Sequence, residues 1–169
     1  SQGILRGGTA NSDSHTLAVE TLGYPRTLVF AGQSLASFDR ERFNAAVRQG
    51  RMVGSNGPVL LACIDGEDGG CHEPSLESFR PRSGAALRVE VRAAPWIPVE
   101  EIRVVVNGRV AARVAADLAV PADPFGSDGV LRYQGAIPVD DLLAGVSGDA
   151  WVVVEAGSHL WPAADREED

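Results

Sequence analysis

The sequence predicts a mainly β protein with an antiparallel β-sandwich in its C-terminal part. From Pro58 onward, short apolar runs recur, several of them alternate apolar and charged residues with a period of two, and polar or glycine-rich turns separate them. Five to seven short strands of this kind are typical of a sandwich of the immunoglobulin-like type. We therefore expect two parts, an N-terminal one at 1–57 and the sandwich at 58–169.

Two strands flanking a tight turn give the clearest local signal in the second part. Residues 102–106 and 109–114 are strand-like, and Asn107-Gly108 stands between them. Asn-Gly between two such runs predicts a hairpin, because both residues tolerate positive φ. Further strands are expected at 59–64 (ending in the turn signal Asp65-Gly66), 86–93, 130–137 and 151–156.

The N-terminal part mixes loops with one short strand and one helix. The strand is expected at 28–30, and an apolar stripe at i, i+3 and i+4 predicts a helix within 37–50. Ser37 or Asp39 can cap this helix, and Gly50 can end it.

Composition narrows the classes of partner. The formal net charge is −8, and all 15 basic residues are arginine. Nucleic acid is not an expected partner, because phosphate contacts need clustered positive charge. No apolar run approaches the roughly 18 residues that span a bilayer, so no membrane segment is expected. The chain begins at Ser1 without an initiator Met or signal peptide, and we expect it to come from a longer protein.

The redox state of the two cysteines is left open by the sequence. Cys63 and Cys71 flank a glycine-rich, acidic loop. A disulfide across this loop would indicate a periplasmic or secreted protein, whereas two unrelated thiols would fit the cytoplasm.

The tryptophans have different expected environments. Trp151 heads an apolar strand and is expected in the core. Trp96 and Trp161 each stand beside a proline and are expected to be partly exposed.

Asp13 and His15 are the strongest candidates for chemistry. In an extended segment, residues i and i+2 point to the same side, so both side chains can reach one site while Ser12 and Ser14 face away. A carboxylate beside an imidazole suits zinc, manganese or iron. The alternative is a turn or helix cap, since clusters of Ser and Asp commonly form both.

Four segments in the first third of the chain resemble the end of the barrel in PHP-domain metallohydrolases, specifically the carbaryl-hydrolase-like (CehA/McbA) group. They are Asn-Ser-Asp-Ser-His-Thr at 11–16, Gly-Tyr-Pro-Arg-Thr at 23–27, Phe-x-x-Ala-x-x-x-Gly-Arg at 43–51 and Ser-Asn-Gly-Pro at 55–58. In that family, segments of these types close the catalytic barrel and lead into a C-terminal β-sandwich. Four signals in this order are more specific than Asp-x-His alone.

The resemblance implies that 1–57 is the remnant of a PHP (β/α)7 barrel with Asp13 and His15 as its last metal ligands. The intact site would hold two or three divalent ions (Zn, Mn or Fe), which activate water against phosphoester, amide, ester or carbamate bonds of a small-molecule substrate. Arg26 would contact an anionic substrate or transition state, although a structural ion pair is an equal alternative.

The chain also departs from the family pattern. The His-x-His segment and other ligands that precede Asp-x-His in the family are missing, and the remaining histidines, His72 and His159, fall in the sandwich region. Fewer than 60 residues cannot supply seven βα units of about 30 residues each. We therefore expect the isolated chain to be inactive and the rest of the barrel to be its partner. The apolar surface left by a missing barrel would favour homo-oligomers.

A second interpretation remains open. The chain can be a non-catalytic β-sandwich module, for binding or for packing against a partner domain.

Overall fold

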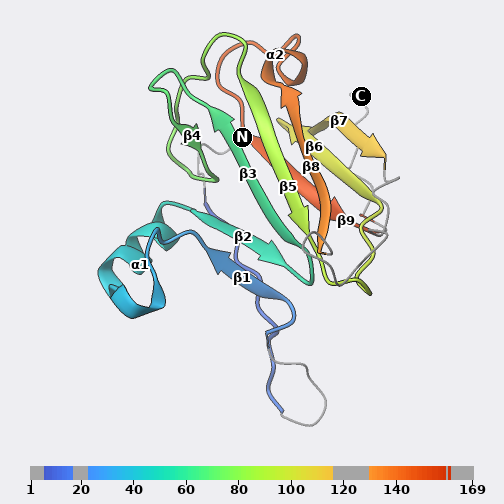
Figure 1. Ribbon diagram of the computed structural model, residues 1–169. Helices are drawn as coiled ribbons and strands as arrows, with labels where there is room; N and C mark the ends of the chain where they lie inside the picture. Colours follow the sequence, from blue (N-terminus) through green and yellow to red (C-terminus); the bar gives the residue numbers. More distant parts are fainter. Residues whose placement is uncertain (1–5, 17–22, 116–129, 159, 161–169) are drawn as a thin grey trace, which may run out of the picture. The chain divides into compact units, whose positions relative to one another are not determined.

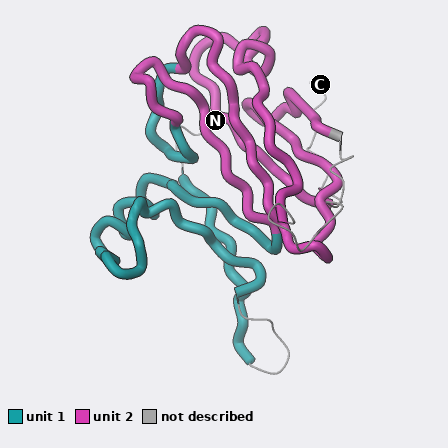
Figure 2. Tube along the Cα trace, viewed as in Figure 1, with its two compact units in different colours: residues 1–57, 72–80 teal, residues 58–71, 81–169 magenta. Residues whose placement is uncertain are grey.

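The protein is described here by a computed structural model, which covers residues 6–16, 23–115, 130–158 and 160. The chain separates into two compact units (Figure 2). The first unit comprises 1–57 together with 72–80, and the second comprises 58–71 and 81–169. The segment 72–80 therefore groups with the N-terminal residues, although in sequence it interrupts the second unit.

The second unit contains two antiparallel sheets, as a β-sandwich does (Figure 1). A four-stranded sheet has the order β4-β3-β5-β8, and a three-stranded sheet has the order β7-β6-β9. The prediction of a mainly β fold with antiparallel sheets is thereby confirmed. The strands are β3 (Val59–Asp65), β4 (Cys71–His72), β5 (Ala86–Arg92), β6 (Glu101–Val106), β7 (Arg109–Ala115), β8 (Leu131–Pro138) and β9 (Val152–Gly157).

The core of the second unit is centred on β5 and β6. On β5, Leu87, Val89 and Val91 are almost fully buried and alternate with more exposed residues, as the period of two predicts. On β6, Ile102 and Val104 are fully buried. Removing this apolar surface from water is the main favourable contribution to the fold.

The predicted hairpin at Asn107-Gly108 is present. The two residues have φ angles of 50° and 87°, the left-handed pair that a type I′ turn requires. They join β6 to β7, with Val106 opposite Arg109. The local sequence therefore determines both the turn and the register at this point.

The helix of the first unit, α1 (Arg40–Arg48), is capped by Asp39. The Asp39 carboxylate accepts hydrogen bonds from two backbone amides of the first turn. Ser37, the other predicted cap, instead ends a short 3-10 helix, η1 (Leu35–Ser37). Gly50, with φ of 69°, lets the chain turn away after the helix, as predicted.

A two-stranded antiparallel ribbon completes the regular structure of the first unit. It pairs β1 (Arg26–Val29) with β2 (Met52–Ser55). The strand predicted at 28–30 thus starts two residues earlier. β2 was not predicted, because a run of four residues that includes Gly54 and Ser55 carries little strand signal.

A short helix, α2 (Val139–Leu142), was also not predicted. It follows Pro138 and has Asp140 and Asp141 in its first turn, where acidic side chains interact favourably with the positive end of the helix dipole. Its buried residues are Val139 and Leu142. These signals are visible in the sequence, but four residues are too few for helical periodicity.

The two cysteines form a disulfide. Cys63 of β3 is bonded to Cys71 of β4, with 5.4 Å between their Cα atoms. Of the two alternatives left open by the sequence, the structure therefore has the bridge.

The expectation for Trp151 was wrong. The residue is 47% exposed. It precedes β9, and its backbone pairs with Asn107 at the tip of the hairpin, so its ring lies near Gly108 and not between the sheets. Trp96 is 77% exposed, as expected. Trp161 lies outside the described residues.

Candidate functional site

The side chains of Asp13 and His15 approach each other, as predicted. His15 Nε2 lies 3.9 Å from Asp13 Oδ1, and the side chains are 73% and 86% exposed, respectively. Ser12 and Ser14, the residues on either side of Asp13, are less exposed, and Ser14 Oγ donates a hydrogen bond to Ser12 Oγ at 2.9 Å. The segment departs from a regular strand at Asp13, whose φ of 50° lies in the left-handed region that Asp tolerates better than most residues.

The segment before the Asp13–His15 pair is held against the β1–β2 ribbon. Thr27 Oγ1 accepts a hydrogen bond from Ala10 N at 2.9 Å and donates one to Ala10 O at 2.7 Å. A Cβ at Gly7 would lie 2.9 Å from the Met52 side chain and 3.1 Å from the backbone of Gly50. The absence of a side chain at Gly7 therefore accommodates this close approach, and the ribbon positions the chain that leads to the pair.

Arg26 lies on β1, next to Thr27 in sequence. Its Nη1 donates to the carbonyl of Gly23 and its Nη2 to the carbonyl of Gly57, both at 3.4 Å. These bonds link the turn before β1 to the turn after β2. The guanidinium therefore has a visible structural function, through backbone carbonyls and not through the ion pair considered as the alternative.

The geometry of the Asp13–His15 pair can be compared with that of metal ligands. Two ligand atoms about 2.1 Å from a tetrahedral ion lie about 3.4 Å apart. The observed 3.9 Å is somewhat wider, and small rotations of two exposed side chains would close the difference. The donor types fit zinc, manganese or iron, but the number of donors does not. Within the part of the chain that the structure describes, no group of three or more His, Cys, Asp or Glu residues is placed to hold a metal ion.

The remaining histidines do not add to the pair. His72 lies in β4 of the four-stranded sheet, in the sandwich region as expected, although contact clustering groups it with the first unit, and it stacks on Phe79 with 4.1 Å between the ring centroids. His159 lies outside the described residues.

A buried carboxylate that the sequence identified only as part of a turn lies in the second unit. The Asp65 side chain is 12% exposed and accepts hydrogen bonds from Arg82 Nη2 at 2.9 Å and from Arg88 Nε at 3.1 Å. The bond from Arg88, followed by that from Arg82, holds the pKa of Asp65 below its ordinary value, although burial acts in the opposite direction. Asp65 is therefore a charged structural anchor, not a group suited to proton transfer near neutral pH.

Charged residues of the three-stranded sheet form a second ionic cluster. Arg103, whose side chain is 3% exposed, donates to Glu155 Oε2 from Nε at 3.1 Å and from Nη2 at 2.9 Å. Arg113 Nη1 contacts Glu101 Oε2 at 2.9 Å. Since Arg103 stands opposite both Glu155 and Arg113 in the register, strand pairing itself brings these charges together.

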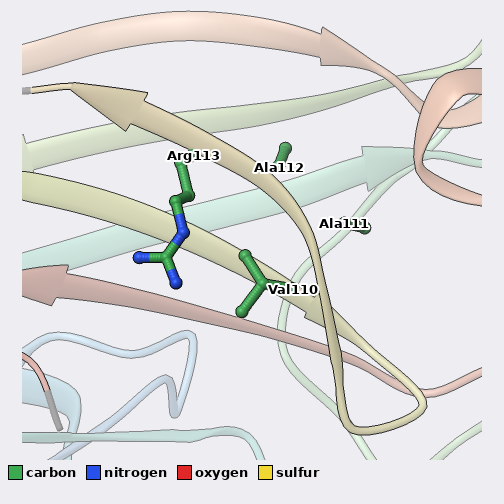
Figure 3. A pocket seen from close by; sticks show the side chains of 4 residues that line it. All are labelled: Val110, Ala111, Ala112 and Arg113. Atoms are coloured by element: carbon green, nitrogen blue, oxygen red, sulfur yellow. The ribbon is translucent and has the colours of Figure 1, made fainter. Parts of the chain in front are cut away.

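A shallow surface hollow follows β7 and is lined by Val110, Ala111, Ala112 and Arg113 (Figure 3). All four residues come from one strand at the edge of its sheet. Ala111 is an extra residue in the pairing with β6, and such a bulge bends an edge strand. The lining contains no carboxylate, imidazole or thiol, so the hollow offers no catalytic group.

No protein-family model, curated protein or solved structure matches this chain. Within the described residues, no helix has the length and apolar character needed to cross a membrane.

Proposed function

We propose that Asp13 and His15 supply two ligands of a divalent-metal centre in a PHP-type hydrolase, and that the other ligands come from polypeptide outside the described residues. The observation that carries the proposal is the approach of Asp13 Oδ1 and His15 Nε2 on two exposed side chains. A metal bound there would activate water for attack on a phosphoester, amide, ester or carbamate bond. The small-molecule substrate and the need for two or three ions follow from the resemblance alone.

The lack of a core in the first unit supports its assignment as part of a larger domain. Among the described residues, Ala46 is its one buried hydrophobic side chain. Leu35 is 96% exposed, Phe38 55% and Tyr24 51%. A unit that buries so little apolar surface gains little free energy on folding, so further packing from the remainder of a barrel would stabilise it.

Arg26 has a separate place in the proposal. Its guanidinium already binds two backbone carbonyls, which supports a structural role. Contact with an anionic substrate stays a prediction for the intact enzyme.

Paramagnetic Mn²⁺ tests the metal pair without requiring activity. In an NMR titration of this chain, we expect the ring signals of His15 to broaden at lower Mn²⁺ concentration than those of His72, because two protein ligands hold the ion longer than one. The variant Asp13→Asn should remove this preference and leave His72 unaffected. Equal broadening of all histidines in the unmodified protein would contradict a metal role for the pair.

A second test addresses the enzyme. We expect the natural reading frame to continue upstream of Ser1 and to encode a His-x-His segment, and the longer protein to hydrolyse phosphoester or carbamate substrates in a manner that depends on His15. A natural protein that lacks a His-x-His segment ahead of Asp13 would refute the hydrolase proposal.

The alternative function is a non-catalytic β-sandwich module. It is favoured by the distribution of the core, because all the other buried hydrophobic side chains of the described residues lie in the second unit. The Cys63–Cys71 disulfide supports a periplasmic or secreted location under either proposal. Selective Mn²⁺ broadening at His15 distinguishes the two, since the module requires none.

A further inference from the structure

Residues 72–80, which we call the strap, bind residues 49–51, which connect α1 to β2 and which we call the joint. Leu76 N donates to Gln49 O at 2.7 Å, and Arg51 Nη2 contacts Glu73 Oε2 at 2.8 Å. Gln49 Nε2 also donates to Glu77 Oε1 at 3.1 Å. The strap therefore contacts the joint, residues 49–51, and both segments belong to the first unit (Figure 2).

Gly50 allows the strap to lie close to the joint. A Cβ at Gly50 would stand 2.7 Å from Leu76 Cγ, a distance that real Cβ atoms essentially never show. The missing side chain of Gly50 therefore makes room for the side chain of Leu76.

Both ends of the strap are anchored in the second unit at the end of β3. At one end, Cys71 is bonded to Cys63. At the other, Pro81 forms an isolated β-bridge with Gly66, and Arg82 N donates to Asp65 O at 3.2 Å. The first anchor combines this covalent bond, which breaks on reduction, with the two-residue pairing of β4 and β3, whereas the second consists of hydrogen bonds and an ion pair that reduction leaves intact.

We propose that the Cys63–Cys71 disulfide is a redox-sensitive clamp that keeps the strap docked on the α1–β2 joint. A dithiol reductant delivers two electrons and two protons to the bridge, yields two thiols and itself becomes a disulfide. The end of the strap at Cys71 is then held only by the two-residue pairing of β4 with β3, which is free to open, and docking must overcome the entropy of a longer free segment. Its hold on residues 49–51 weakens as a result.

The joint leads into the structure that positions the Asp13–His15 segment. Arg51 O accepts a hydrogen bond from Phe30 N, and β2 pairs with β1, on which Thr27 holds Ala10. Release of the strap therefore loosens the end of the ribbon. This inference stands whether or not Asp13 and His15 bind a metal.

Hydrogen exchange on the intact chain tests the clamp. On reduction with dithiothreitol, the Leu76 amide should exchange at least roughly threefold faster, while amides of β5 and β6 keep their rates. The double variant Cys63→Ser/Cys71→Ser should show the fast rate without reductant and no further change with it. An unchanged Leu76 rate once both thiols are free, or equal acceleration in β5 and β6, would overturn the proposal.

A matched pair of glycine variants tests the docking site with the disulfide intact. Gly50→Ala and Gly32→Ala introduce the same methyl group at φ angles of 69° and 62°, but nothing lies within 4 Å of the position at Gly32. Gly50→Ala should accelerate exchange at Leu76, and Gly32→Ala should not. If Gly50→Ala does not fold, Glu73→Gln weakens the ion pair to Arg51 without backbone strain and should give the same result. Equal rates in the Gly50→Ala and Gly32→Ala proteins, or in Glu73→Gln and the unmodified protein, would show that the strap is not docked at the joint.

Discussion

The carboxylate of Asp65 couples the stability of the second unit to pH. It lies at the end of β3 beside two arginines, and it also accepts a hydrogen bond from Ala86 N at 3.4 Å. A carboxyl group whose pKa is lower in the folded than in the unfolded protein binds its proton more tightly when unfolded, so protonation favours unfolding. The stabilisation is therefore present above the ordinary pKa of 3.8 and is lost as the pH falls through the lower folded value.

We predict that Asp65→Asn lowers the melting temperature by a few degrees at pH 6 to 8 and removes part of the acid sensitivity. The amide cannot form ion pairs with Arg82 and Arg88, so two cations lose their partner. The difference from the unmodified protein should shrink as the pH falls below the ordinary pKa of 3.8, where the carboxyl group begins to protonate in the unfolded chain, and should vanish below the lower pKa of the folded protein. Thermal unfolding followed by circular dichroism from pH 2.5 to 8 measures this; a constant difference across that range would contradict it.

For Asp13 and His15, sequence spacing predicted the proximity of the side chains but not the backbone conformation. The i, i+2 spacing predicted that the side chains would meet, and they lie within 3.9 Å. It did not predict the left-handed φ of Asp13 or the role of Gly7 in the approach to the ribbon. Both depend on what the segment packs against.

Among the elements, α1 begins where the side chain of Asp39 caps its N-terminus. The sequence offered Ser37 and Asp39 as caps, and the structure uses Asp39. The two positions differ because Ser37 belongs to η1, whereas Asp39 has the extended backbone, with φ of −118° and ψ of 116°, that a cap requires.

We predict that Asp39→Ala lowers the free energy of unfolding of the structure containing α1 by about 1 kcal/mol, the usual effect of losing a helix cap. Ser37→Ala is the matched control and should change it by less than about 0.5 kcal/mol. Hydrogen exchange of the first-turn amides of Glu41 and Arg42, with urea unfolding, provides the measurement. Equal effects of the two substitutions would show that the carboxylate does not cap the helix.

The elements of the second unit were easier to anticipate than those of the first. β5, β6, β7 and β9 follow alternation or continuous apolar runs, and the turn between β6 and β7 has a specific sequence signal. β2, β4 and α2 are two to four residues long, too short for any period to appear. Their partners in other parts of the chain stabilise them.

On the scale of the whole molecule, the two units differ in both core and charge. The first unit carries seven arginines and six carboxylates, a net charge of +1, while the second carries eight arginines and 17 carboxylates, a net charge of −9. The buried hydrophobic side chains of the described residues lie almost entirely in the second unit. The second unit thus buries enough apolar side chains to form a core of its own, whereas the first unit buries very few.

We predict that the first unit opens locally at much lower free energy than the second. Amides of β1 and β2 should exchange at least tenfold faster than those of β5 and β6, because local stability follows buried apolar contacts. Native-state hydrogen exchange at neutral pH under non-reducing conditions measures both sets in one sample. Equal protection of the β1 and β2 amides and of the β5 and β6 amides would indicate that the first unit is a fully stable domain.

The sequence by itself determined the mainly β character of the chain and the strands around Asn107-Gly108, because each depends on backbone geometry over a few residues. Tertiary structure alone decided that Cys63 and Cys71 are joined, that Asp65 is buried between two arginines, that Trp151 is exposed and that 72–80 binds the α1–β2 joint. These features depend on contacts between residues that are far apart in the chain. Pairing register and packing decide which of these side chains meet, and a local sequence pattern does not contain that information.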